Sequence, residues 1–197
     1  NGLGQLHRFG LDSKILAVAG DSTFFHACIP ALINARHKGA DVTFVILDNS
    51  STAMTGFQPH PGILTPSEDH NRVSIASVVE GIGVDFLNVV DSNDVSLLID
   101  SIHNAVQKPG IKVIITKGVC RLEEGKTLGM YDDFPEVRII KEKCRGESCK
   151  VCVSSFGCVA LAWDEEEGHP RILDDLCIRC GACVYICPHD AIEGGVQ

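Results

Sequence analysis

The residues with the clearest capacity for chemistry are the cysteines. The chain has ten, and eight of them lie between Cys144 and Cys187. The downstream four follow the pattern C-x-x-C-x-x-C-x-x-x-C-P: Cys177, Cys180, Cys183 and Cys187. Three thiolates at this interval can bind three irons of one cluster, while the fourth, before proline, turns toward another cluster. Because a zinc site usually divides its ligands into two pairs, the spacing favours a 4Fe-4S cluster over zinc or disulfides.

The upstream four cysteines have looser spacing, and Val159 stands where such a run usually has proline. A crossed arrangement predicts one cluster on Cys144, Cys149, Cys152 and Cys187, and a second on Cys158, Cys177, Cys180 and Cys183. The alternative is one cluster plus structural thiols. Two clusters would serve the transfer of single electrons. The remaining Cys28 and Cys120 are expected to be small buried hydrophobic residues.

A second set of candidate residues follows two apolar runs. Gly20, Asp21 and Ser22 end the first run and open a helical segment, and Asp48 and Asn49 end the second. A carboxylate and an amide at adjacent strand ends can bind one hard cation through oxygen. Such a cation could hold a diphosphate, and ligands of open α/β sheets bind at the carboxyl ends of the strands. The pattern is typical of a thiamine diphosphate site with Mg²⁺.

Alternating apolar and amphipathic segments predict an open, mostly parallel α/β sheet. The expected strands are 14–19, 42–47, 84–90 and 111–116, the first two read as buried, and the expected helices are 22–38, 71–81 and 94–107. Pro30 should kink or delay the first helix, and Asn93 is the expected N-cap of the third.

The cysteine-rich part predicts a small second module. Residues 117–140 look irregular, and the runs 160–163 and 171–173 predict a hairpin. The chain is therefore expected to hold a thiamine diphosphate-binding α/β domain, 1–140, followed by a small α+β ferredoxin-like domain with two 4Fe-4S clusters, 141–197.

Composition narrows the class of protein. The formal net charge is −9, which argues against nucleic acid as a main partner. No apolar run reaches the length that spans a bilayer, so no membrane partner is expected. Without a secretory leader, cysteines at metal-ligand spacing predict a reducing, cytoplasmic location.

The segments Gly20–His26 and Leu47–Gly62 resemble the large (alpha) subunits of the indolepyruvate:ferredoxin oxidoreductase family, whose chains also end in a two-cluster ferredoxin domain. The resemblance covers essentially the whole chain. It implies a 2-oxoacid:ferredoxin oxidoreductase that decarboxylates an arylpyruvate oxidatively, with Mg²⁺ and thiamine diphosphate as cofactors. It further implies coenzyme A as acyl acceptor, ferredoxin as electron acceptor, and a smaller partner subunit.

The resemblance also implies site residues. Asp21 and Asn49 should bind Mg²⁺ through side-chain oxygens and Ser51 through its backbone carbonyl. The cofactor-binding set is expected to be Gly20, Asp21, Ser22, Thr23, Asn49, Ser51, Thr55 and Gln58. His26 is the candidate catalytic residue on the substrate side, with a structural role as the alternative. His60, between two prolines, is expected at the surface of its loop, and Met54 is expected to pack.

The chain departs from the family in length. Family members carry an N-terminal pyrimidine-type domain, so this chain is expected to be a fragment or one of several chains, inactive alone. The Glu that activates the aminopyrimidine is not identifiable. Other readings remain open: an enzyme for another 2-oxoacid, a non-catalytic iron–sulfur electron-transfer module, or a zinc-binding interaction protein.

Overall fold

The structure is a computed structural model that describes residues 2–11, 13–63, 72–128 and 134–195, without the side chains of 125–128. It divides into two compact units, Asn1–Cys120 and Arg121–Gln197. Residues 121–140, which the sequence analysis assigned to the first domain, are grouped by compactness with the second unit. The two units are described separately below.

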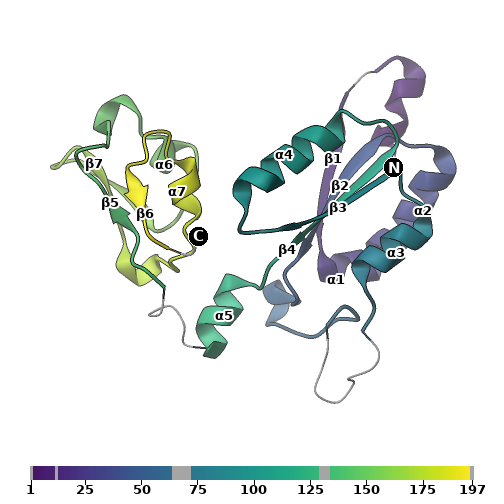
Figure 1. Cartoon of the computed structure of the whole chain (residues 1–197), viewed down its shortest axis with the longest axis horizontal. Helices are drawn as coiled ribbons and strands as arrows, with labels where there is room; N and C mark the ends of the chain where they lie inside the picture. The colour runs from purple at the N-terminus through teal and green to yellow at the C-terminus, as the bar shows by residue number, and fades with distance from the viewer. Residues whose placement is uncertain (1, 12, 64–71, 129–133, 196–197) are drawn as a thin grey trace. The chain divides into compact units, whose positions relative to one another are not determined.

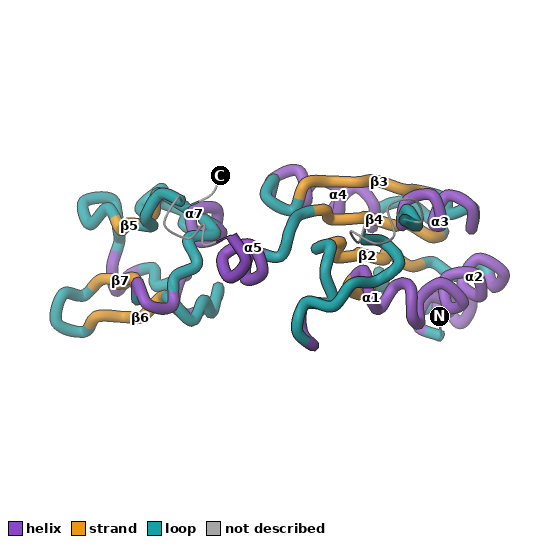
Figure 2. The backbone as a smooth tube through the Cα atoms, turned by 90° about the horizontal axis from the view of Figure 1, so that it is seen from below, coloured by secondary structure: helices purple, strands orange, loops and turns teal. Residues whose placement is uncertain are grey.

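A four-stranded parallel sheet forms the centre of the first unit, which confirms the expected α/β class. Its strands lie in the order β1 (Leu16–Gly20), β2 (Val42–Asp48), β4 (Ile111–Lys117) and β3 (Phe86–Asp91). Figure 2 shows these strands side by side. The two central strands, β2 and β4, are rich in Val and Ile and largely buried, as expected for strands covered on both faces.

Strand β1 differs from the expected fully buried strand. It lies at an edge of the sheet and pairs only with β2 among the described strands. Leu16 is 48% exposed and Val18 is 56% exposed, while Ala17 and Ala19 pack into the core. A short apolar run therefore indicates a strand without indicating whether it lies at the centre or the edge of the sheet.

The segment that follows β1 is helical but irregular. It consists of α1 (Asp21–Thr23), a π-helical turn (Phe24–Cys28) and α2 (Ile29–Lys38). The regular helix begins only beside Pro30, which has no N–H to donate and whose ring would clash with the carbonyl four residues earlier. The expected delay of the regular helix is confirmed.

Helices cover both faces of the sheet (Figure 1). α2 and α3 (Ile75–Ile82) pack on one face, and α4 (Val95–Val106) packs on the other. α3 begins after its N-cap Ser74, and the residue at which the sequence analysis began this helix lies outside the described residues. The N-cap of α4 is Asp94 instead of Asn93, because Asp94 Oδ1 accepts the Leu97 N–H at 2.8 Å.

One charged side chain lies within the sheet. Lys112, on the central strand β4, is 1% exposed. Its ammonium pairs with the carboxylate of Asp41 and donates to the Gly110 carbonyl at 2.9 Å. The buried charge is thus both paired and hydrogen-bonded, as burial of a charge requires.

The second unit is built from short elements. Two antiparallel pairs, β5 (Arg138–Ile139) with β8 (Ile192–Glu193) and β6 (Leu161–Asp164) with β7 (His169–Ile172), frame its small core. The second pair confirms the expected hairpin. The short helices are α6 (Val151–Ser154) and α7 (Ala182–Ile186). In addition, α5 (Arg121–Leu128) lies where the sequence analysis expected irregular chain.

The reason for the missed helix α5 is its composition. Its sequence, RLEEGKTL, has no apolar stripe to indicate a helix. Arg121 and Glu124 form an ion pair at 2.6 Å across one turn, a local contact that stabilises such a polar helix. None of the helices in the described ranges is both long enough and apolar enough to cross a membrane.

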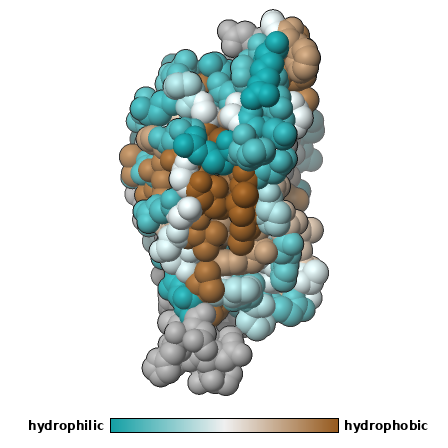
Figure 3. Space-filling model, turned by 90° about the vertical axis from the view of Figure 1, so that its right-hand side faces the viewer, coloured by the Kyte–Doolittle hydropathy of each residue, from teal (hydrophilic) through white to brown (hydrophobic). Residues whose placement is uncertain are grey.

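Apolar side chains also reach the surface of the first unit. On the side that carries α2 and α3, hydrophobic residues form an elongated band bordered by hydrophilic ones (Figure 3). A shallow pocket between α2 and strands β1 and β2 is lined by Ala17, Cys28, Ala31, Leu32, Ala35, Val42 and Phe44. Cys28 is therefore half-buried in an apolar setting, close to what the sequence predicts.

Candidate functional site

Asp21 is placed by the end of β1. Gly20, the last residue of that strand, pairs with Leu47 of the parallel strand β2, so Asp21 and Asp48 are the next residues at the same edge of the sheet. Asp21 is 2% exposed, and its Oδ1 accepts the Ser22 N–H at 2.7 Å. A carboxylate this deeply buried requires compensation by a hydrogen-bond donor or a cation.

Asp48 is a second buried carboxylate, which the sequence analysis did not select. Burial is the main cause that raises its pKa, and the negative charge of Asp21 raises it further. The Ser50 backbone N–H, Lys117 and Arg72 act in the opposite direction. A cation bound beside Asp48 would offset the negative charge of Asp21 at this place. In the sequence, the position of Asp48 directly before Asn49 was the one indication that it belongs to the site.

The turn after β2 presents Asn49 and Ser51. The Asn49 Oδ1 accepts the Ser51 N–H at 3.0 Å, and Ser50 between them has a φ of 57°. The loop after β4 holds this turn from the other side, because the Cys120 N–H donates to the Asn49 carbonyl at 3.2 Å. The turn thus has a defined shape at the same sheet edge as Asp21.

His60 is buried, so its expected place at the loop surface is wrong. The residue is 6% exposed, and its Nε2 lies 3.0 Å from Asp21 Oδ2. Its Nδ1 accepts the Gly62 N–H at 3.1 Å. The prolines on either side, Pro59 and Pro61, predict an irregular loop, but nothing local shows that the loop folds back over Asp21.

Three buried polar atoms of this region lack a well-aligned hydrogen-bond partner among the described residues: Asp21 Oδ2, Ser51 Oγ and His60 Nε2. The first and third are 3.0 Å apart, although their geometry does not meet the criteria of a hydrogen bond. These buried polar atoms are mostly oxygens and still lack hydrogen-bond partners. They therefore fit the hard cation and diphosphate that the sequence predicts.

The other predicted cofactor residues lie in the same loops. Ser22 is half-buried, and Thr23 and His26 are exposed at the start of the helical segment. In the loop after β2, the Thr55 hydroxyl donates to Gln58 Oε1 at 2.5 Å, and Gln58 Nε2 donates back to the Thr55 carbonyl at 2.6 Å. Met54 is fully exposed, so the expectation that it packs is wrong.

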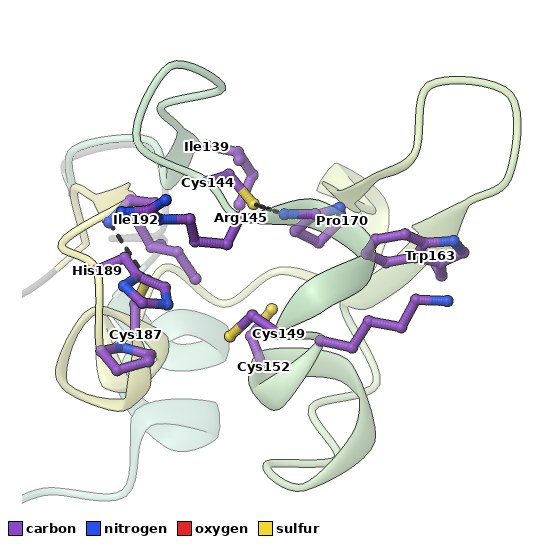
Figure 4. A pocket seen from close by; sticks show the side chains of 14 residues that line it. Ile139, Cys144, Arg145, Cys149, Cys152, Trp163, Pro170, Cys187, His189 and Ile192 are labelled. Carbon is purple, nitrogen blue, oxygen red and sulfur yellow. Dashed lines mark hydrogen bonds between the residues drawn. The ribbon is translucent and has the colours of Figure 1, made fainter.

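The upstream thiols form one group. A pocket is lined by Cys144, Cys149, Cys152 and Cys187 (Figure 4). Burial raises the pKa of the Cys152 thiol, and the other three thiols of the group raise it further. Two backbone donors reach sulfur here: the Gly146 N–H lies 3.4 Å from Cys144 Sγ, and the Ala191 N–H lies 3.2 Å from Cys187 Sγ.

The downstream thiols form a second group. Another pocket is lined by Cys158, Cys177, Cys180 and Cys183, together with apolar residues that include Val137, Phe156 and Leu161. Burial, and then the neighbouring thiols of the same group, raises the pKa of Cys183 to about 11. The structure therefore brings the eight cysteines together in the two crossed sets of the sequence analysis. Whether each set binds a cluster remains a prediction.

The thiols of each group line a pocket and do not converge on one position where a single metal ion could bind. Among the residues that the structure describes, no three His, Cys, Asp or Glu side chains are arranged to hold a single metal ion. A four-iron cluster takes its ligands on several irons, so grouped thiols that do not converge on one point are compatible with it.

Comparison with known protein families gives two matches. Residues 5–116 match the family described as thiamine pyrophosphate enzyme, C-terminal TPP binding domain. Residues 170–193 match the 4Fe-4S binding domain. The first match includes Asp21, Asp48, Asn49, Ser51 and His60, and the second includes the cysteines of the downstream run.

Several curated proteins are similar to nearly the whole chain, and each is named indolepyruvate oxidoreductase subunit IorA. The protein from Thermococcus kodakarensis is 37% identical over 95% of this chain and 29% of its own length. Those from Pyrococcus horikoshii and Archaeoglobus fulgidus are 38% and 39% identical, over 96% and 98% of this chain and 29% and 30% of their own lengths. The chain thus spans less than a third of these relatives.

One solved structure, of a thiamin diphosphate-dependent enzyme from Mycobacterium smegmatis, is 23% identical over 60% of this chain and 20% of its own. Its TM-score is 0.42, a similarity too low to support a shared fold.

Proposed function

Because the chain belongs to the thiamine pyrophosphate enzymes, we propose that it forms the diphosphate-binding and electron-transfer part of a 2-oxoacid:ferredoxin oxidoreductase. The observation that carries the proposal is the presence of both sites in one chain. Buried Asp21 and Asp48 lie beside Asn49 at one sheet edge, and eight cysteines form two groups in the second unit.

The protein's own residues have distinct tasks in this proposal. Asp21 and Asn49 bind Mg²⁺ through side-chain oxygens, and Ser51 binds it through its carbonyl. The diphosphate is held by residues of the two loops: Gly20, Ser22, Thr23 and Thr55. His26 and Gln58 lie toward the thiazolium ring and the substrate. Asp48 tightens the site by adding a second negative charge near the cation.

The cofactors supply the difficult chemistry. Bound thiamine diphosphate stabilises the negative charge that remains when a 2-oxoacid loses carbon dioxide, and the clusters accept electrons one at a time. Coenzyme A takes the acyl group, and ferredoxin takes the electrons. The names of the relatives support indolepyruvate, an arylpyruvate, as the substrate, with a smaller subunit completing the enzyme.

The proposal is tested on the assembled enzyme that carries this chain, purified without oxygen. We expect reduction of ferredoxin or viologen that requires thiamine diphosphate, Mg²⁺, coenzyme A and a 2-oxoacid, with indolepyruvate preferred over pyruvate and 2-oxoglutarate. Asp21→Ala should abolish cofactor binding in calorimetry and leave the iron content unchanged. Intact clusters without any thiamine diphosphate binding in the native enzyme would instead support a non-catalytic electron-transfer module.

A further inference from the structure

We propose that His60 is a positioning residue that orients the carboxylate of Asp21 toward the metal ion. The inference rests on the proposed function, because it takes Asp21 as a metal ligand. It adds a residue from farther along the loop after β2 to a site that the ends of β1 and β2 and the start of this loop otherwise define.

Burial and distance join the two residues. The side chain of His60 is fully buried and that of Asp21 is 2% exposed, with His60 Nε2 lying 3.0 Å from Asp21 Oδ2. Neither atom has another hydrogen-bond partner among the described residues. In a dry setting a pair of this kind interacts strongly, since water neither screens nor replaces it.

The other ring nitrogen sets the proton position. His60 Nδ1 accepts the Gly62 N–H at 3.1 Å, so Nδ1 carries no proton in that contact. In the neutral ring the proton then lies on Nε2, the nitrogen that faces Asp21. The N–H of His60 is thereby on the nitrogen that lies 3.0 Å from Asp21 Oδ2.

Packing limits how the ring can move. The ring of Phe25 lies 5.6 Å from that of His60, centroid to centroid. A Cβ added at Gly62 would lie 2.8 Å from Phe25 and 2.9 Å from His60, so this position has no room for a side chain. The imidazole is therefore held between the π-helical turn and its own loop.

The arrangement leaves coordination capacity on Asp21. Oδ1 accepts the Ser22 N–H at 2.7 Å and Oδ2 faces His60, whereas an ionised carboxylate has about four acceptor positions. With the Ser22 hydrogen bond on Oδ1, a donor from His60 to Oδ2 would fix the carboxylate plane and leave both oxygens able to bind a cation. Outer partners of ligating groups act in this way, and their loss typically weakens metal binding about 10- to 100-fold.

The experiment compares His60→Ala and His60→Gln in the assembled enzyme. Thiamine diphosphate binding is measured by calorimetry over a series of Mg²⁺ concentrations. We expect His60→Ala to raise the Mg²⁺ concentration needed for half-maximal binding by about 10- to 100-fold. Glutamine retains an N–H donor near the position of Nε2, so His60→Gln should recover most of the affinity.

Two controls separate the hydrogen bond from packing. Phe25→Leu reduces the ring contact and keeps the donor, so its Mg²⁺ requirement should stay within about threefold of the native value. His37→Ala removes an exposed histidine from α2 and should change nothing. Iron content and thermal unfolding establish that each variant is folded.

Two results would overturn the inference. One is an unchanged Mg²⁺ requirement in folded His60→Ala. The other is an equal loss of Mg²⁺ affinity in His60→Ala, His60→Gln and Phe25→Leu, because packing alone would then explain the effect. Failure of the native enzyme to bind thiamine diphosphate at any Mg²⁺ concentration would overturn the proposed function itself, which distinguishes the two failures.

Discussion

Cys152 and Cys187 line the same pocket, although a hairpin and four other cysteines of the two sets separate them along the chain. The charge of Cys187 is among those that raise the pKa of the Cys152 thiol. Cys158 and Cys183 have the same relationship in the other pocket. Each group thus takes three ligands from one half of the motif and one from the other.

We therefore predict a specific pattern of iron loss. The native chain should bind about eight irons, and Cys149→Ser and Cys187→Ser should each remove about four. The double variant of Cys149 and Cys187 should lose no more than either single variant, because both serve one cluster. Cys149→Ser combined with Cys158→Ser should lose nearly all iron. Iron analysis under anaerobic conditions, with electron paramagnetic resonance, gives the count, and additive losses for Cys149 and Cys187 would contradict the crossed sets.

The two clusters should differ in reduction potential. Backbone N–H groups donate to Cys144 and Cys187, and Arg145 lines the same pocket, whereas the Cys183 pocket has a largely apolar lining. Donors and positive charge stabilise the reduced, more negative cluster, so the cluster of the Cys152 group should have the higher potential.

Redox titration of Cys180→Ser and Cys149→Ser, each with one cluster left, measures the two potentials separately. Arg145→Gln should lower only the potential of the Cys152 group. Arg138→Gln, the same charge change at an exposed strand position, serves as control. A higher potential for the Cys183 group would show that other influences dominate.

Sequence patterns predicted the helices and strands better than they predicted which residues contact one another. Runs such as 42–47 and 111–116 are mostly apolar, which is sufficient to predict strands. The crossed cysteine sets follow from spacing alone. In contrast, the burial of His60 depends on how its loop folds over Asp21, and the choice of Asp94 over Asn93 as cap depends on the residue at which α4 begins. Neither contact has a local periodic signal.

Two glycines should respond oppositely to alanine. Gly81 lies in α3 with no atom within 4 Å of an added Cβ, so Gly81→Ala should stabilise the fold by about 0.5–1 kcal/mol. Gly110 has a φ of 85°, and its added Cβ would lie 2.2 Å from Asp85 Oδ2. Gly110→Ala should therefore destabilise by more than about 1 kcal/mol. Urea unfolding followed by circular dichroism compares both with the native chain, and equal midpoints would contradict the argument.

Cys28 should be a slow nucleophile. Burial raises the pKa of its thiol above the ordinary value of 9.0, so at pH 8 the reactive thiolate is scarcer than in an exposed cysteine. Iodoacetamide labelling, read by peptide mass spectrometry, should give a rate midpoint above pH 9.0. Because the folded pKa exceeds the unfolded one, Cys28 contributes stability below pH 9 that is lost as pH rises through the folded value. Labelling as fast as that of a free peptide cysteine at pH 8 would refute this.

The buried Lys112 has a consequence for how the sheet assembles. It lies on the α4 side of β4, opposite Thr43 and Phe86. Sliding β4 by one position would turn its ammonium toward the apolar core between the sheet and helices α2 and α3. Such a pairing would bury the charge away from Asp41, which the native alignment of β2 and β4 supplies. The charge of Lys112 thus favours the native alignment of the strands over shifted ones. A methionine of similar size would fill the same space without this preference.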